Sequence, residues 1–328
     1  MNGLIQHIDN MIRIENKKTT ELTKDEHQQI LDGFNKVFSL DRTLEYQMNQ
    51  YVQNPFGYSW HNVVYDDDKI IGHICAVPSY YWCNGEKVIF VDGVDAFIFK
   101  EYRDGEIFLN QLQSYFGHMK KIGAKLMLGF PDAKVMKLYA KTKVYKKIGE
   151  METYILPYRI GGVKPALKPF NFLSKAFAWS YVYLTGLFAS SKVTTFKIEK
   201  DAESFNETRY KRADSDYCMV KDGDLEFFYK CMPFKGVRAA FLIDVTGKSA
   251  RHFNQAVKCI MTHNSKDFDV ILYVGNLYFK NSGLIKVPHK LAPKQFNFII
   301  KFFDKTYNND VVNDIRNWDV NLATYDVI

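Results

Sequence analysis

The segment Val88–Leu112, VIFVDGVDAFIFKEYRDGEIFLNQL, decides the fold of this chain of 328 residues. Residues 87–99 are rich in β-branched and aromatic side chains, which predicts a strand. The turn KEYRDGE follows, and apolar side chains then recur at helical spacing as far as Met119. The strand therefore enters a helix through a turn that bears Arg103 and Gly105. Backbone N–H groups at a helix N-terminus lack intrahelical partners, so such a turn can bind a pyrophosphate.

The residues on either side predict more strands and helices. Upstream, Thr23 and Glu26 have the spacing of a capping box at the start of a helix. Residues 60–65 and 69–81 predict two strands which, with 87–99, form an antiparallel meander. Downstream, the pattern predicts a strand, a helix and a last strand, at residues 125–130, 135–139 and 151–156.

The second half of the chain repeats this order of elements. The pattern predicts a hairpin of strands at 216–220 and 224–231, followed by a long strand at 237–245. A turn then leads into a helix at 249–262, and two more strands are expected at 268–274 and 296–303. The shared order indicates an internal duplication. We expect domains at 1–158 and 197–328, joined by a connector at 159–196 in which Gly161 and Gly162 lie among prolines.

The connector contains an apolar, aromatic stretch without charge, AFAWSYVYLTGLFASS at residues 176–191. This stretch is shorter than the roughly 20 residues that span a bilayer, so no transmembrane segment is expected. We interpret it as a buried connecting helix, and a helix lying on a membrane surface is the alternative.

Composition narrows the class of protein. Hydrophobic residues make up 47% and charged residues 25%, as in globular proteins and unlike disordered chains. The net charge of +7 suits an anionic ligand, but the charges are spread along the chain, so nucleic-acid binding is not expected. The five cysteines form no CxxC pair, so neither a metal site nor a set of disulfides is predicted. This use of cysteine favours a location in the reducing cytoplasm. The N-terminus lacks the apolar core of a signal peptide.

The element order resembles that of the GNAT superfamily of acyl-CoA N-acyltransferases. The resemblance also rests on EYRDGEI after the long strand and FPDAKVMKLYAK after the next one, and it covers 1–158 well and 197–328 loosely. It implies an α/β (α+β) fold of tandem GNAT-like domains, each with a mixed, mostly antiparallel sheet flanked by helices. The second domain is expected to be non-catalytic, because its turn at 246–249 lacks the arginine.

The same resemblance implies that acetyl-CoA or another acyl-CoA is the co-substrate. Family members bind its pyrophosphate with a turn of approximately R/Q-x-x-G-x-G/A, of which this chain keeps an arginine and one glycine. Asp104 and Glu106 stand where the family has small or neutral residues. The residues expected to bind the cofactor are Val94, Ala96, Phe97, Arg103, Asp104, Gly105, Glu106 and Ile107.

Three side chains are candidates for catalysis. Tyr139, eight residues past Pro131, matches the place of the family's acid, which protonates the leaving thiolate. Asp92 and Asp95 are candidate bases, because carboxylates on a central strand are unusual. They are three residues apart, so in a regular strand at most one of them faces a cleft. In the alternative interpretation, all three are buried structural groups, as we expect for His73.

The sequence therefore predicts a cytoplasmic bacterial enzyme that transfers an acyl group, expected to be acetyl, from CoA to a primary amine. On resemblance alone, the acceptor is expected to be an amino sugar or its nucleotide conjugate. Two other functions stay open: a non-catalytic duplicated protein that binds a ligand, and an aminoacyl-tRNA-dependent peptidyl transferase. Weak contact with a membrane surface also stays open, and the sequence does not fix the oligomeric state.

Overall fold

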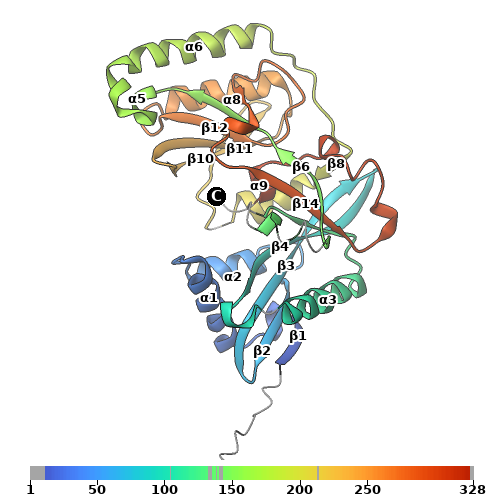
Figure 1. Ribbon diagram of the computed structural model, residues 1–328. Helices are drawn as coiled ribbons and strands as arrows, with labels where there is room; N and C mark the ends of the chain where they lie inside the picture. The colour runs from blue at the N-terminus through green and yellow to red at the C-terminus, as the bar shows by residue number, and fades with distance from the viewer. Residues whose placement is uncertain are drawn as a thin grey trace, which may run out of the picture. The chain divides into compact units, whose positions relative to one another are not determined.

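The computed structural model describes residues 12–103, 105–131, 135–137, 139, 143–212 and 214–325. Its strands form two sheets, both visible in Figure 1. The larger sheet has the order β1-β2-β3-β4-β5-β14-β6, with β8 paired to β3, and the smaller one has the order β13-β7-β12-β11-β10-β9. The β4–β5 and β11–β12 pairs are parallel, whereas β1–β2, β2–β3, β9–β10 and β10–β11 are antiparallel. The expected mixed, mostly antiparallel sheets are thus confirmed.

The strands are β1 (Ile12–Lys18), β2 (Trp60–Asp66), β3 (Lys69–Cys83), β4 (Glu86–Ile98), β5 (Leu126–Gly129), β6 (Lys146–Met151), β7 (Thr153–Pro157), β8 (Ile198–Lys200), β9 (Cys218–Asp222), β10 (Leu225–Phe234), β11 (Val237–Val245), β12 (Val270–Val274), β13 (Ile285–Val287) and β14 (Phe296–Phe302). The α-helices are α1 (Lys24–Phe38), α2 (Leu44–Val52), α3 (Glu106–Lys121), α5 (Ile160–Val163), α6 (Asn171–Leu187), α7 (Ala202–Phe205), α8 (Ala250–His263) and α9 (Leu322–Tyr325).

The described residues pack as two compact units. Unit 1 contains residues 12–80, 88–129 and 301–307, and unit 2 contains 81–87, 130–300 and 308–325. The expected division at residues 158 and 197 stays a prediction, because compact packing does not by itself define where one duplicated domain ends.

Unit 1 is a sheet covered on both faces. In Figure 1, α1 and α2 lie on one side of strands β2 to β4, and α3 lies on the other. Ile30 and Phe34 of α1 pack in one buried cluster with Phe97 and Phe99 at the end of β4. The expected capping box starts α1: the Thr23 side chain accepts from the Glu26 N–H, and the Glu26 carboxylate accepts from the Thr23 N–H.

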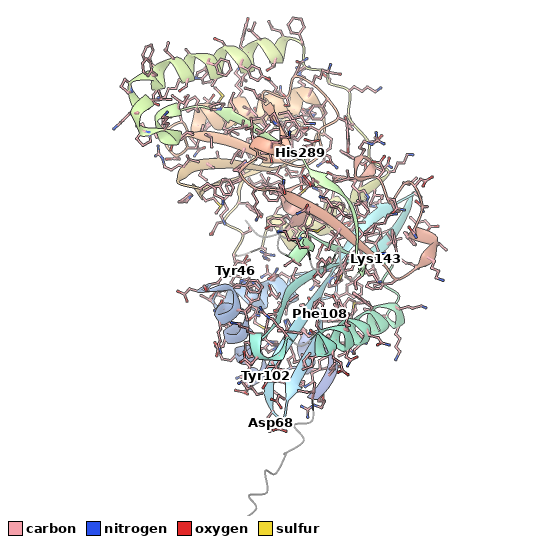
Figure 2. All side chains as sticks on the ribbon, viewed as in Figure 1. Tyr46, Asp68, Tyr102, Phe108, Lys143 and His289 are labelled. Carbon is pink, nitrogen blue, oxygen red and sulfur yellow. The ribbon has the colours of Figure 1, made fainter. Side chains whose placement is uncertain are left out.

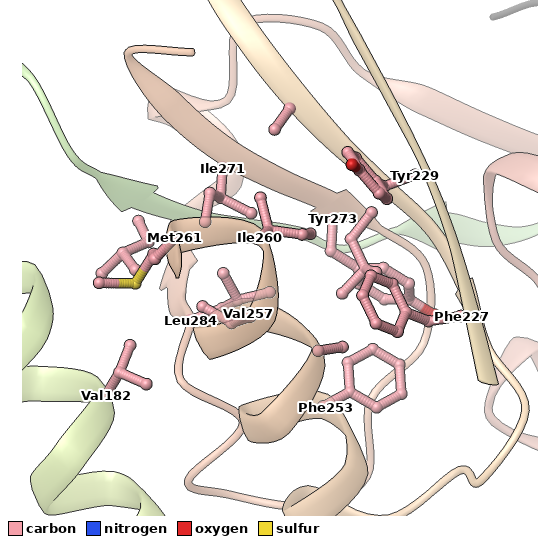
Figure 3. Close-up of a cluster of buried hydrophobic side chains, with 14 of the residues drawn as sticks. Val182, Phe227, Tyr229, Phe253, Val257, Ile260, Met261, Ile271, Tyr273 and Leu284 are labelled. Atoms are coloured by element: carbon pink, nitrogen blue, oxygen red, sulfur yellow. The ribbon is translucent and has the colours of Figure 1, made fainter. Parts of the chain in front are cut away.

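Unit 2 repeats the strand–helix–strand arrangement around its own core. The long strand β11 leads through a turn into α8, and β12 then pairs parallel to β11, as β4, α3 and β5 do in unit 1. Figure 3 shows the α8 side chains Phe253, Val257 and Ile260 packed against Tyr273 of β12 and Phe227 of β10. The expected repetition of elements is therefore present in the fold.

Two expectations about individual strands are wrong. The single strand expected at 151–156 is two strands: β6 ends at Met151, and β7 starts at Thr153 and pairs with β12 of the smaller sheet. The strand expected at 296–303 as part of the second half pairs with β6 of the larger sheet, for example Phe296 opposite Met151. Partner choice depends on which strand edges the fold leaves open, which the local pattern does not report.

The interpretation of residues 176–191 as a buried connecting helix is also wrong. Only Ala178 and Val182 of α6 are buried, and the remaining large side chains are mostly exposed. Apolar composition predicts burial only on average, and a folded surface still contains much apolar area. Within the part of the chain that the structure describes, no helix has both the length and the apolarity to cross a membrane.

Unit 2 also contains a buried cluster of charges. The Asp244 carboxylate accepts from Lys200 Nζ at 2.7 Å, from Lys248 Nζ at 2.5 Å and from the Tyr210 hydroxyl. Lys248 Nζ also lies 3.1 Å from Asp319 Oδ1. Burial alone would raise the pKa of Asp244, but the two ammonium groups hold it far below its usual range, so the carboxylate stays ionised.

We predict that Asp244→Asn destabilises unit 2 by about 3–5 kcal/mol, because it removes the nearer of the two carboxylates that neutralise the buried Lys200 and Lys248. Urea unfolding at neutral pH measures this loss. The control is Glu207→Gln, which breaks the exposed Lys211–Glu207 pair and should cost less than about 1 kcal/mol. Equal effects of the two substitutions would contradict the prediction.

Candidate functional site

The candidate site is built on the second half of β4. The parallel register of β4 and β5 runs from Phe90–Leu126 to Asp92–Leu128, and β5 ends at Gly129. β4 continues to Ile98, so its edge at residues 94–97 lies beyond the end of β5. A strand edge of this kind presents N–H and C=O groups that can pair with an extended ligand.

The backbone of β4 is irregular at Asp95, which has a left-handed φ of 51°. For a residue other than glycine this conformation costs about 1–2 kcal/mol, so the surrounding structure must hold it in place. Irregularities of this type interrupt the alternation of side chains along a strand and re-aim those that follow.

The Asp95 side chain is fixed by two residues of unit 1, Arg42 between α1 and α2 and Tyr51 of α2. Oδ1 accepts from Arg42 Nη1 at 2.8 Å, and Oδ2 accepts from the Tyr51 hydroxyl at 2.8 Å. The Arg42 guanidinium also lies 4.4 Å from the Phe34 ring and 5.1 Å from the ring of Tyr46, which is labelled in Figure 2. Burial by itself would lower the pKa of Arg42, but the Asp95 carboxylate raises it. The pair is therefore charged and held from several sides.

A row of buried hydrogen bonds holds the Asp95 backbone carbonyl. His73 Nδ1 lies 3.0 Å from this carbonyl, His73 Nε2 lies 2.9 Å from His61 Nδ1, and His61 Nε2 lies 2.9 Å from Thr19 Oγ1. Burial lowers the pKa of His73 to about 4 and that of His61 well below its usual range. Both imidazoles are therefore neutral at physiological pH. The expectation of a hydrogen-bonded, structural His73 agrees with this geometry.

The hydrogen bonds of this row all run in one direction, from Thr19 towards the Asp95 carbonyl. A carbonyl oxygen only accepts, so His73 Nδ1 donates to Asp95, and the other nitrogen of this neutral ring must accept. His61 Nδ1 is then the donor to His73, and His61 Nε2 accepts from the Thr19 hydroxyl. The Thr19 oxygen in turn accepts from the Ser59 N–H at 2.8 Å. The proton positions follow from the carbonyl at one end and the amide at the other.

Asp92 and Asp95 lie on the same face of β4, contrary to the expectation from a regular strand. Asp92 Oδ2 accepts from Ser79 Oγ at 2.9 Å. Ser79 is two residues from Val77, so both side chains lie on the same face of β3, where Val77 packs against Tyr51 of α2. Asp95 contacts Tyr51 directly. The left-handed residue accounts for the difference, because it shifts the alternation by one position.

The turn after β4 places Arg103 and Gly105 at the start of α3. Arg103 is exposed, and its Nε donates to the Ile98 carbonyl at 2.8 Å. Gly105 precedes α3 with a φ of 95°, and a Cβ at this position would meet no atom within 4 Å. The backbone here is thus both left-handed and open to an approaching ligand. Asp104 lies outside the described residues.

The expected pantetheine-binding residues differ in exposure. Ala96 is exposed and Val94 is half-buried, but Phe97 is buried in the α1 cluster. The Phe97 side chain is therefore turned away from a ligand, and only its backbone is suited to such a contact. Glu106 and Ile107 form the first turn of α3. All these positions stay predictions as cofactor contacts.

Tyr139 lies in unit 2, and its ring centroid is 4.3 Å from that of Tyr145. Burial raises the pKa of Tyr139 to about 12, so its hydroxyl stays protonated at neutral pH. Its role as an acid stays a prediction.

Comparison by sequence finds no matching family profile and no matching curated protein. Comparison with solved structures finds similar folds. A GCN5-related N-acetyltransferase from Kribbella flavida is 9% identical with a TM-score of 0.59, covering 90% of this chain and 73% of that one. One from Anabaena variabilis is 12% identical with a TM-score of 0.57, covering 89% and 74%. The Saccharomyces cerevisiae N-myristoyltransferase with bound myristoyl-CoA is 13% identical with a TM-score of 0.54, covering 88% and 80%.

This chain has a GNAT fold. The similarity covers about nine-tenths of it, so the expectation of a two-domain GNAT-like architecture is confirmed. At these identities the comparison establishes the fold, and the residues of the site carry the functional argument.

Sequence reasoning missed a cavity of about 480 Å³ inside unit 2. It is lined by aromatic side chains, by two lysines and by five acidic residues, namely Glu199, Glu203, Glu226, Asp244 and Asp319. Lys200 and Lys248 are already paired with carboxylates, so the surplus of negative charge favours a cationic group in this cavity. The lining combines residues from 193–210 and 226–248 with Asp319, so no single local motif marks the cavity.

We predict that unit 1 loses stability as the pH falls from about 6.5 to about 4, because His73 binds a proton more readily in the unfolded chain. The direction and the pH range of this loss follow from the lowered pKa of His73. Its contribution to the free energy of unfolding is complete above pH 6.5, the pKa in the unfolded chain, and is lost as the pH falls towards 4, the pKa in the folded protein. The loss should be on the order of 3 kcal/mol, measured by urea unfolding. In His73→Asn the free energy of unfolding should depend less on pH over this range. If the unmodified protein shows no such pH dependence, the prediction that buried His73 stays neutral is wrong.

Proposed function

We propose that this chain transfers an acyl group from acyl-CoA to a primary amine. The observation that carries the proposal is the edge of β4 beyond β5, which leads through Gly105 into the N-terminus of α3. In a GNAT fold, this arrangement supports a pantetheine arm paired along residues 94–97 and a pyrophosphate at the turn, with Arg103 adding positive charge. The yeast N-myristoyltransferase with bound myristoyl-CoA supports the same cofactor class.

The proposed reaction needs one base and one acid. The amine nitrogen attacks the thioester carbonyl, a C–N bond forms, and the C–S bond then breaks to release CoA thiolate. We assign removal of the amine proton to Asp92, because Arg42 and Tyr51 already occupy both oxygens of Asp95. Tyr139 is the proposed acid for the thiolate, which its protonated hydroxyl supports.

Asp95 is then a positioning residue. Its side chain and carbonyl hold the left-handed backbone of β4 next to the proposed pantetheine contacts. The remaining parts of the proposal rest on resemblance: acetyl as the acyl group, an amino sugar or sugar nucleotide as the acceptor, and a bacterial cytoplasm as the location. The five free thiols agree with a reducing compartment.

We predict that acetyl-CoA at about 100 times its dissociation constant stabilises the protein by about 2.7 kcal/mol, measured as a rise in melting temperature. Arg103→Glu should abolish the rise, since it places a negative charge beside the pyrophosphate. The matched control is Lys258→Glu, a charge reversal on the exposed side of α8 in unit 2, which should retain the rise. If neither acetyl-CoA nor longer acyl-CoAs raise the melting temperature, the chain is a binding scaffold and acyl transfer is excluded.

We predict that Asp92→Asn lowers kcat by about 10²–10⁴-fold while leaving the acetyl-CoA-induced rise in melting temperature unchanged. CoA release with glucosamine and with a nucleotide-linked amino sugar as acceptors measures the rate. Asp68→Asn is the control, because Asp68 lies in the exposed β2–β3 turn labelled in Figure 2. A full rate in Asp92→Asn would exclude Asp92 as the base.

A further inference from the structure

Helix α6 in unit 2 presents a large apolar surface that the described residues leave uncovered. Its side chains Phe172, Leu173, Phe177, Trp179, Tyr183, Leu184 and Leu187, together with Phe188 just after it, are between 37% and 75% exposed. We call these eight residues the α6 face. Contiguous apolar surfaces of this extent on soluble domains mark a site of interaction.

The orientation of α6 is fixed, so the α6 face does not turn inward. On the inner side, Asn254 Nδ2 of α8 donates to the Val182 carbonyl at 2.9 Å and to Thr185 Oγ1 at 2.9 Å. The Tyr181 hydroxyl donates to the Leu284 carbonyl at 3.3 Å. Figure 3 shows Val182 on the side of α6 that faces the core. The exposed aromatic side chains therefore belong to the folded surface.

The segment of the chain that contains α6 carries charge of one sign, and of its basic residues Arg159 is paired with Asp269. Residues 159–197 contain no Asp or Glu and carry six basic residues: Arg159, Lys164, Lys168, Lys175, Lys192 and Lys197. Lys164, Lys168 and Lys192 are exposed near the two ends of the helix. Apolar side chains flanked by lysines, with Trp and Tyr among them, are the composition of helices that lie in the interface of an anionic bilayer.

Other occupants suit this surface less well. A second copy of the chain would bring the same lysines together around a two-fold axis, and like charges would oppose association. The 17 residues of α6 fall short of the roughly 20 that span a bilayer, and its inner side is bonded to α8.

We propose that α6 docks unit 2 onto an anionic membrane surface, with the helix axis in the plane of the interface. The aromatic and leucine side chains of the α6 face enter the boundary between headgroups and acyl chains, and the flanking lysines contact the acidic headgroups. This proposal is independent of acyl transfer.

Vesicle flotation of the full chain tests the proposal. The protein should float with vesicles of equal parts phosphatidylcholine and phosphatidylglycerol, bind pure phosphatidylcholine far less, and detach partly in high salt. The double variant Tyr183→Glu and Leu187→Glu should weaken binding by at least about tenfold, because it places two charges in the interface. Leu291→Glu is the control, since Leu291 is an exposed leucine of unit 2 outside α6. Absence of binding to the anionic vesicles would overturn the proposal.

The contribution of charge is tested separately. Lys164→Gln and Lys168→Gln should each weaken binding about fivefold, whereas Lys290→Gln, an exposed lysine elsewhere in unit 2, should not. Unchanged melting temperatures establish that the variants fold. Light scattering distinguishes the rival occupant: a dimer that dissociates in the Tyr183→Glu and Leu187→Glu variant, with no vesicle binding by the unmodified chain, would assign the α6 face to self-association.

Trp179 reports on the interface directly. Its fluorescence should shift to shorter wavelength on addition of anionic vesicles, because the indole leaves water, and the shift should be lost in Trp179→Phe. An unchanged spectrum with bound vesicles would place the contact elsewhere on the protein and overturn the proposal.

Discussion

The left-handed backbone at Asp95 is the constraint around which unit 1 is arranged. Arg42 and Tyr51 hold the carboxylate from the α1–α2 side, and His73 holds the carbonyl through a row of neutral side chains. The bonds from Tyr51 and His73 are buried and that from Arg42 is partly buried, so replacing them by water has a cost. The interruption of β4 brings Asp92 and Asp95 onto one face and lies within the strand edge, residues 94–97, that the proposed cofactor would use.

Unit 2 also has an irregular long strand with a buried aspartate, but different residues stabilise it. Its long strand β11 is also irregular, since Phe228 pairs with Asp244 and Tyr229 pairs with Leu242, which leaves Ile243 unpaired. The aspartate beside this irregularity is neutralised by Lys200 and Lys248. In unit 1 the Arg42 guanidinium neutralises the Asp95 carboxylate, and the neutral row of histidines holds only the Asp95 carbonyl. That the second half is non-catalytic stays a prediction.

Helix α6 shows why composition alone does not decide burial. Its sequence is apolar on nearly every side, but only Ala178 and Val182 are buried against the core, with Tyr181 packed beside them. Close approach of the two helices uses small or polar residues, as at Gly186, where a Cβ would lie 2.9 Å from Asn254 Oδ1. The bulky aromatic side chains therefore remain outside, and the proposed membrane contact gives them a physical role.

The sequence by itself determined most of the longer elements and their order, because hydrophobic periodicity, the Thr23–Glu26 capping box and the Gly105 turn are local signals. The strand–turn–helix pattern was also enough to anticipate the GNAT fold, whereas the cofactor role of the Gly105 turn stays a prediction. Only the tertiary structure decided that β14 pairs with β6, that Asp92 and Asp95 share a face, and that Arg42 and His73 surround Asp95. Those facts depend on contacts between residues far apart in the chain and on one irregular φ angle, which no local pattern encodes.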